Sequence, residues 1–128
     1  MDHKQEVIQV LLCEPHKKAH ITTIANTLQS LQQTVGGCIE ALYPYSDSVA
    51  VICNDKGKIN GLELNRTLRD EDGRVYDIVA GTFLVVGLAD EHFTSLTPEL
   101  QKKYTQLFEY PEMFIRVGSM ILAMPEEG

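Results

Sequence analysis

Basic and amide side chains gather in residues 54–69, NDKGKINGLELNRTLR, where their chemistry suits an anion. Four basic residues stand there against two acidic ones, which gives +2, while the other residues carry −9 and the whole chain −7. The glycines of this segment, Gly57 and Gly61, can leave backbone amides available to bind an anion, as in anion-binding nests. Lys58, Asn54 and Asn65 add charged and neutral donors. The planar guanidinium of Arg66 suits a phosphate or a carboxylate. The segment therefore predicts a bound anion, nucleotide-like in combining phosphate with neutral edges.

The same residue types are common in turns, so a structural role is the competing interpretation for each of them. Asn-Gly and Lys-Gly pairs are frequent turn sequences because asparagine tolerates the left-handed backbone region. We favour the turn role for any single residue of this segment except Arg66, which we expect to bind the ligand.

A carboxylate, Asp77, lies inside the apolar run of residues 75–86. An unpaired buried carboxylate is costly. Asp77 therefore either contacts a ligand, as an acceptor or acid–base residue, or forms an ion pair with Arg66 or Arg74, and we favour the ion pair. Gly81 can relieve a bulge or allow close approach of a ligand. The predicted ligand-binding residues are Asn54, Lys58, Asn65, Arg66, Asp77 and Thr82.

Cys13, His16 and His20 have the spacing C-x2-H-x3-H, and these residue types can hold zinc. A fourth ligand would have to come from a distant segment, and Pro15 prevents a helix from presenting Cys13 and His16 together. We therefore favour a buried cysteine with solvated loop histidines, and we predict neither a metal nor a cofactor. Signatures of serine hydrolases, P-loops, dinucleotide-binding loops and HExxH enzymes are missing from the sequence. Binding is accordingly expected rather than catalysis, and no catalytic residue is predicted.

Hydrophobic patterns predict the elements that position these residues. Strands are expected at residues 7–13, 38–43 and 49–53, and over 75–88 with a break near Gly81. Apolar residues at helical spacing predict a helix over 21–35, capped by Thr22 or Thr23 and ended by Gly36-Gly37. Thr97 and Pro98 begin a second helix, near residues 98–109. Residues 54–72 are rich in turn sequences.

These elements predict an α+β fold: a single domain with a mixed, mainly antiparallel β-sheet covered by about two helices. The domain spans residues 1–128, with a core over 6–110 and a C-terminal strand or packed tail over 111–128. Hydrophobic residues at 44% and charged residues at 23% are values of an ordinary globular chain of 128 residues.

Charge and cysteine usage bear on partners and compartment. A net charge of −7 disfavours duplex nucleic acid, which needs a basic face, and no apolar run is long enough to span a membrane. Three cysteines without framework spacing predict reduced thiols in a cytoplasm. The outer face of the predicted helix 21–35 is uncharged, which favours a homo-oligomer, most simply a dimer.

The joint order and spacing of several short motifs resembles the DUF3846 family, small proteins of unassigned function from bacteria, phages and mobile elements. The resemblance covers residues 7–107. It is carried by Leu31-Gln32, Val35-Gly36-Gly37-Cys38-Ile39-Glu40, Cys53-Asn54, Gly57-Lys58-Ile59-Asn60-Gly61-Leu62, Asn65-Arg66, Asp72-Gly73 and Tyr76-Asp77-Ile78-Val79-Ala80-Gly81-Thr82-Phe83.

The resemblance implies a phage or mobile-element accessory protein in the cytoplasm of a bacterial host. We expect a non-enzymatic anti-defence protein that sequesters an anionic small molecule such as a nucleotide immune signal. One alternative is a protein–protein inhibitor of a host enzyme, docking through the glutamine-rich helix. A second alternative is a small nucleotide-processing enzyme that uses Asp77 or a cysteine.

Overall fold

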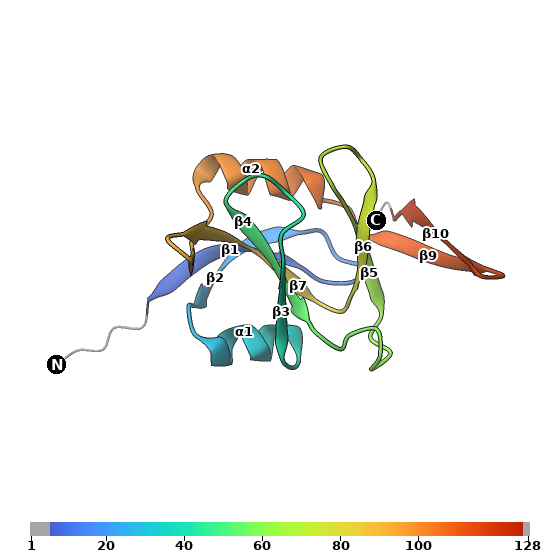
Figure 1. The fold of residues 1–128 in the computed structure, drawn as a ribbon, viewed down its shortest axis with the longest axis horizontal. Coiled ribbons are helices and arrows are strands. Elements are labelled where there is room, and N and C mark those ends of the chain that lie inside the picture. The colour runs from blue at the N-terminus through green and yellow to red at the C-terminus, as the bar shows by residue number, and fades with distance from the viewer. Residues whose placement is uncertain (1–5, 127–128) are drawn as a thin grey trace.

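Residues 6–126, which this computed structural model describes, form two helices and ten strands (Figure 1). The main sheet has six strands. Across its width lie β2 (His20–Ala25), β1 (Val7–Cys13), β7 (Phe83–Ala89), β4 (Val49–Asn54) and β3 (Ile39–Leu42), and the short β8 (His92–Thr94) pairs with β7. All of these pairs are antiparallel. The prediction of an α+β fold with a mainly antiparallel sheet is confirmed.

The central strands β1, β4 and β7 supply two cores because successive side chains of a strand point to opposite faces of the sheet. Leu11, Val51 and Val85 face one core, where they pack near Tyr104 of α2 (Pro98–Leu107). The intervening residues face the second core, under α1 (Leu28–Val35); they include Val10, Ile52, Leu84 and Val86. The two helices therefore cover opposite faces of the sheet (Figure 1).

The predicted helix over residues 21–35 is wrong in its first half. Residues 20–25 form β2, which pairs with β1. Four consecutive β-branched residues, ITTI at 21–24, favour a strand, and their apolar spacing fits either structure. The helix begins after Thr27, whose hydroxyl accepts a hydrogen bond from the Ser30 amide at 3.1 Å, and it ends at Gly36 as predicted.

The second helix follows its prediction closely. Thr97 caps α2, its hydroxyl accepting from the Leu100 amide at 3.3 Å, and Pro98 occupies the first turn. Neither helix of residues 6–126 is long and apolar enough to cross a membrane.

A second sheet combines a strand from the segment predicted as turns with one from the β-structure predicted over residues 75–88. β5 (Leu64–Arg69) pairs antiparallel with β6 (Val75–Ala80), and the pairing skips a residue between Leu64 and Arg66. Such a bulge lets two successive side chains point to the same side. Asn65 and Arg66 consequently both enter the interior, each 1% exposed.

The last two strands, β9 (Glu112–Val117) and β10 (Met120–Pro125), form an antiparallel hairpin of their own. Figure 1 shows this hairpin projecting from one end of the molecule, away from both helices. The predicted C-terminal strand is therefore two strands, and they extend outward instead of packing as a tail.

Candidate functional site

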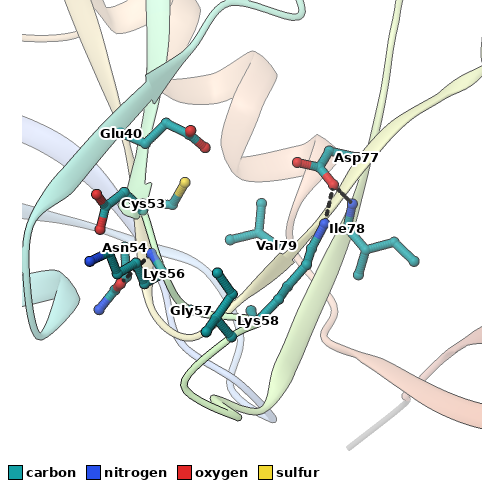
Figure 2. Close-up of a pocket in the computed structure, with 12 residues that line it drawn as sticks. Glu40, Cys53, Asn54, Lys56, Gly57, Lys58, Asp77, Ile78 and Val79 are labelled. Atoms are coloured by element: carbon teal, nitrogen blue, oxygen red, sulfur yellow. Dashed lines mark hydrogen bonds and ion pairs between the residues drawn. The ribbon is translucent and has the colours of Figure 1, made fainter.

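One pocket brings together three of the six predicted ligand residues: Asn54, Lys58 and Asp77 (Figure 2). It lies between the end of β4, the loop that follows it, and β6, and its volume is about 210 Å³. Figure 2 shows Lys58 extending toward Asp77, with the Cys53 sulfur and Glu40 across the pocket. Antiparallel pairing of β3 with β4 places Glu40 directly opposite Cys53.

The loop is shaped by Asn54 and Gly57, so these two residues have the turn role weighed against ligand binding. The Asn54 side chain is buried; its Nδ2 donates to the Val35 carbonyl at 3.2 Å, and its Oδ1 accepts from the Lys56 amide at 2.9 Å. A Cβ at Gly57 would lie 2.7 Å from the Ala80 carbonyl oxygen. Glycine therefore allows this loop to lie against β6.

Lys58 and Asp77 form an ion pair at the edge of the pocket. The Lys58 Nζ donates to Asp77 Oδ1, which also accepts from the Ile78 amide at 2.8 Å. The lysine side chain is 54% exposed and that of the aspartate 35%. The predicted ion pair of Asp77 is thus present, but its partner is Lys58 and neither Arg66 nor Arg74.

Both signs of charge line the pocket. Lys56 and Lys58 stand there against three carboxylates, those of Glu40, Asp55 and Asp77. The positive charge of residues 54–69 is not concentrated at this site, because Arg66 and Arg69 lie outside this pocket. A ligand here would meet both donors and acceptors of hydrogen bonds.

Arg66 is buried away from this pocket. Its guanidinium donates to the carbonyls of Lys17 at 2.7 Å, Phe108 at 3.0 Å and Glu14 at 3.2 Å, and to Asn65 Oδ1 at 2.5 Å. Burial is the main reason that the pKa of Arg66 is lowered from its ordinary value. This arrangement joins the β1–β2 loop to the end of α2, so Arg66 has a structural role here and lies outside the pocket that holds Lys58.

Asn65 and Thr82 also lie outside the pocket. The Asn65 Nδ2 donates to the carbonyls of Cys13 and Gly81, both at 2.9 Å. Thr82 is half-buried in the tight connection between β6 and β7. Of the six predicted residues, the structure therefore brings together Asn54, Lys58 and Asp77, and it separates Asn65, Arg66 and Thr82 from them.

The thiol of Cys53 has little nucleophilic character. Burial first, and then the nearby carboxylates of Glu40 and Asp77, raise its pKa to about 11. A nucleophilic cysteine needs the opposite environment, one that favours the thiolate. Cys53 and Glu40 are not among the ligand residues predicted from the sequence, although pairing the predicted strands 38–43 and 49–53 as a hairpin would place them together.

The residues considered for zinc are dispersed. Cys13 is fully buried, whereas His16 and His20 are exposed. His16 instead bridges two carboxylates, with its Nε2 2.5 Å from Glu63 and its Nδ1 2.8 Å from Glu126. Within residues 6–126 no cluster of three or more His, Cys, Asp or Glu side chains could hold a metal ion.

Comparison with known families supports the resemblance seen in the motifs. A family model described as "Domain of unknown function (DUF3846)" matches residues 8–109. The chain belongs to the DUF3846 family. No curated protein and no solved structure matches it. The DUF3846 match runs from β1 to just past α2, so it contains the whole pocket, while the β9–β10 hairpin follows it.

Proposed function

We propose that this DUF3846 protein binds a small anionic ligand in the pocket beside β6 and sequesters it without changing it chemically. The observation that supports this is the exposed Lys58–Asp77 pair at the edge of the pocket. An exposed pair of this kind contributes little to stability, so it is readily exchanged for a ligand. An anionic group would take the place of the Asp77 carboxylate on the Lys58 ammonium.

The carboxylates that remain define the rest of the ligand. Asp77, once released, and Glu40 would both accept hydrogen bonds from hydroxyl or amino groups. A molecule with an anion at one end and such donors at the other is nucleotide-like. The pocket volume of about 210 Å³ is below the range of about 300–1,000 Å³ typical of small-molecule sites. The pocket would therefore hold no more than one nucleotide unit of a larger ligand.

Binding without catalysis fits the groups around the pocket. The high pKa of Cys53 leaves its thiol protonated, and the sequence carries none of the common nucleophile or metal signatures. Given the phage and mobile-element context of the family resemblance, we propose an anti-defence role, the removal of a nucleotide immune signal in the host's bacterial cytoplasm.

Calorimetric titration with mononucleotides and with cyclic di- and oligonucleotides tests this proposal. We expect binding of at least one of them, and recovery of the ligand with an unchanged mass. Lys58→Ala should weaken binding at least about tenfold, as expected when a charge-assisted hydrogen bond is lost. Lys102→Ala, at an exposed position of α2, is the matched control and should bind as the wild type does.

Asp77→Asn separates this site from a purely structural ion pair. The substitution removes the charge that competes for Lys58 but keeps a side-chain oxygen that can accept a hydrogen bond from the ligand, so the affinity for the anion should stay the same or rise. Binding that is lost in Asp77→Asn but kept in Lys58→Ala would contradict the proposed roles, as would a failure of every nucleotide to bind.

A further inference from the structure

The β9–β10 hairpin carries one face made only of large apolar side chains. Cross-strand partners share a face of an antiparallel pair. The register pairs Met113 with Met124, Ile115 with Leu122 and Val117 with Met120, which places these six side chains on one face. They are 43–60% exposed, so no part of residues 6–126 covers this apolar face.

The opposite face attaches the hairpin to the body. Glu112 accepts a hydrogen bond from the Thr67 hydroxyl at 2.8 Å, and the Glu126 carboxylate, just after β10, lies 2.8 Å from the His16 ring. Phe114 on this side is half-buried. The hairpin is thus held at its base with its apolar face turned outward.

Such a face is unusual for a protein that stays monomeric. Isolated two-stranded hairpins are marginally stable in water and need a further layer on their apolar side. Contiguous exposed apolar patches of this kind mark contact sites. The occupant must itself be apolar, because the face offers no polar side chain.

We propose that this apolar face packs against the same face of a second copy of the chain, forming a dimer with two-fold symmetry. A two-fold contact uses one patch on both partners, and an uncharged apolar face complements itself. Two stacked hairpins would lie about 10 Å apart, as packed sheets do.

Charge favours a second copy over a membrane as the occupant. Each chain carries −7, so two copies repel each other over most of their surface. Arg116 is the only charged residue in 113–124, and the hairpin projects from the body, so contact there keeps the acidic regions apart (Figure 1). An anionic lipid surface would instead need a cluster of basic residues beside the apolar face.

This dimer uses a different contact surface from the homo-oligomer that the sequence predicted, which was based on the uncharged outer face of the first helix. It does not depend on the proposed ligand. The hairpin lies outside the region matched by the family, so the dimer is a property of this chain and need not extend to other DUF3846 domains.

Sedimentation velocity between 1 and 300 µM tests the dimer. A face of six side chains is smaller than the roughly 800 Å² per partner of a standard interface, so we expect reversible dimerisation with a Kd on the order of 10 µM. The double variant Ile115→Thr/Leu122→Thr places β-branched threonines, which favour strands, at the centre of the hairpin and should weaken the dimer at least about tenfold. Ile121→Thr makes the same change on the opposite face and should still dimerise.

A separate variant guards against a folding defect in the double variant. Met120→Lys, near the hairpin tip and away from the body, should also give monomers while its thermal unfolding stays that of the wild type. Three results would overturn the proposal: a wild type that is monomeric throughout, a control weakened as much as the double variant, or a monomer that co-sediments with phospholipid vesicles.

Discussion

Arg66, which the sequence predicted to bind the ligand, instead stabilises the fold through buried hydrogen bonds. Its guanidinium contacts three backbone carbonyls and no carboxylate at hydrogen-bond distance within residues 6–126. Carbonyls in the interior have to be paired, because an unsatisfied buried acceptor is costly. The side chain therefore supplies fixed donors to loops that have no secondary structure to pair them.

Replacing Arg66 should lower the stability of the protein and leave the pocket unaffected. Arg66→Ala leaves three carbonyls and Asn65 without their donor, so we expect a loss of about 3 kcal/mol or more in the free energy of unfolding. Arg66→Lys should not restore it, because one ammonium cannot reproduce the planar fork. Urea denaturation measures this loss.

Arg69→Ala is the matched control. Arg69 is exposed, and its one hydrogen bond to backbone is long, 3.4 Å to the Gly73 carbonyl, so its loss should change the free energy of unfolding by less than about 1 kcal/mol. A fully stable Arg66→Ala protein with weakened nucleotide binding would instead return Arg66 to the ligand role predicted from the sequence.

The sequence could indicate which residue types would bind an anion, but it could not assign each of them to the pocket or to the core. That distinction depends on the bulge at Asn65, which turns both Asn65 and Arg66 inward. A bulge is set by the pairing of two strands, and residues 64–69 carry no regular alternation to reveal it. The structure does bring Lys58 and Asp77, two residues of the predicted ligand set, into one pocket, where they form an ion pair.

At the scale of elements, His16 links the base of the β9–β10 hairpin to the loop before β5 through hydrogen bonds to Glu126 and Glu63. It has a positive φ of 64°, and its ring lies between Glu63 and Glu126. Hydrogen bonds, first to Glu63 and then to Glu126, raise the pKa of His16 above its ordinary value. The imidazolium form is therefore favoured in the folded protein.

This raised pKa predicts that the stabilising effect of His16 decreases with pH. The effect is fully present below the unfolded pKa of about 6.5 and is lost as pH rises through the folded value. The Tm of the wild type should exceed that of His16→Gln by about 2–4 °C at pH 6 and by less at pH 8.5. The expected difference is small because the pair of His16 and Glu63 is largely exposed to solvent. Calorimetry at both values checks this, and His20→Gln should show no such change. An equal difference at the two pH values would contradict it.

Elements were predictable where local sequence signals agreed. Thr97-Pro98 marked α2, and the apolar runs marked β1, β4, β6 and β7. Residues 21–25 were assigned to a helix because Ile21 and Ile24 fit a helical spacing, although pairing with β1 decides their conformation. For residues 111–128 the sequence predicted a strand or a packed tail, but not the turn that makes β9 and β10 a hairpin.

At the scale of the whole molecule, the three free cysteines differ in how deeply they are buried. Cys38 is exposed, Cys13 and Cys53 are buried, and burial raises the pKa of their thiols to about 12 and about 11. Since the thiolate is the reactive form, protection by the fold and by the high pKa act together.

We expect one thiol, that of Cys38, to react rapidly with a disulfide reagent such as Ellman's reagent under native conditions. Cys13, which is fully buried, should react at least about a thousandfold more slowly, because it becomes accessible only when the domain opens. Cys53 lines the pocket but has a raised pKa, so it should also react more slowly than Cys38. Mass spectrometry of the labelled peptides identifies each thiol, and Cys38→Ser removes the fast phase as a control. Labelling of all three at one rate would show that the core opens far more easily than its packing implies.

The position of β7 at the centre of the sheet also has a consequence for how the chain folds during synthesis. β7 pairs with β1 on one side and with β4 on the other, so neither outer part of the sheet can close until residues 83–89 exist. At about 5–20 residues per second, a ribosome would make β1 roughly 4–14 s before its partner. For that interval the β1–β2 hairpin presents an unpaired edge, and non-local pairing of this kind is slow. We therefore expect the nascent chain to depend on general chaperones up to the moment when β7 emerges.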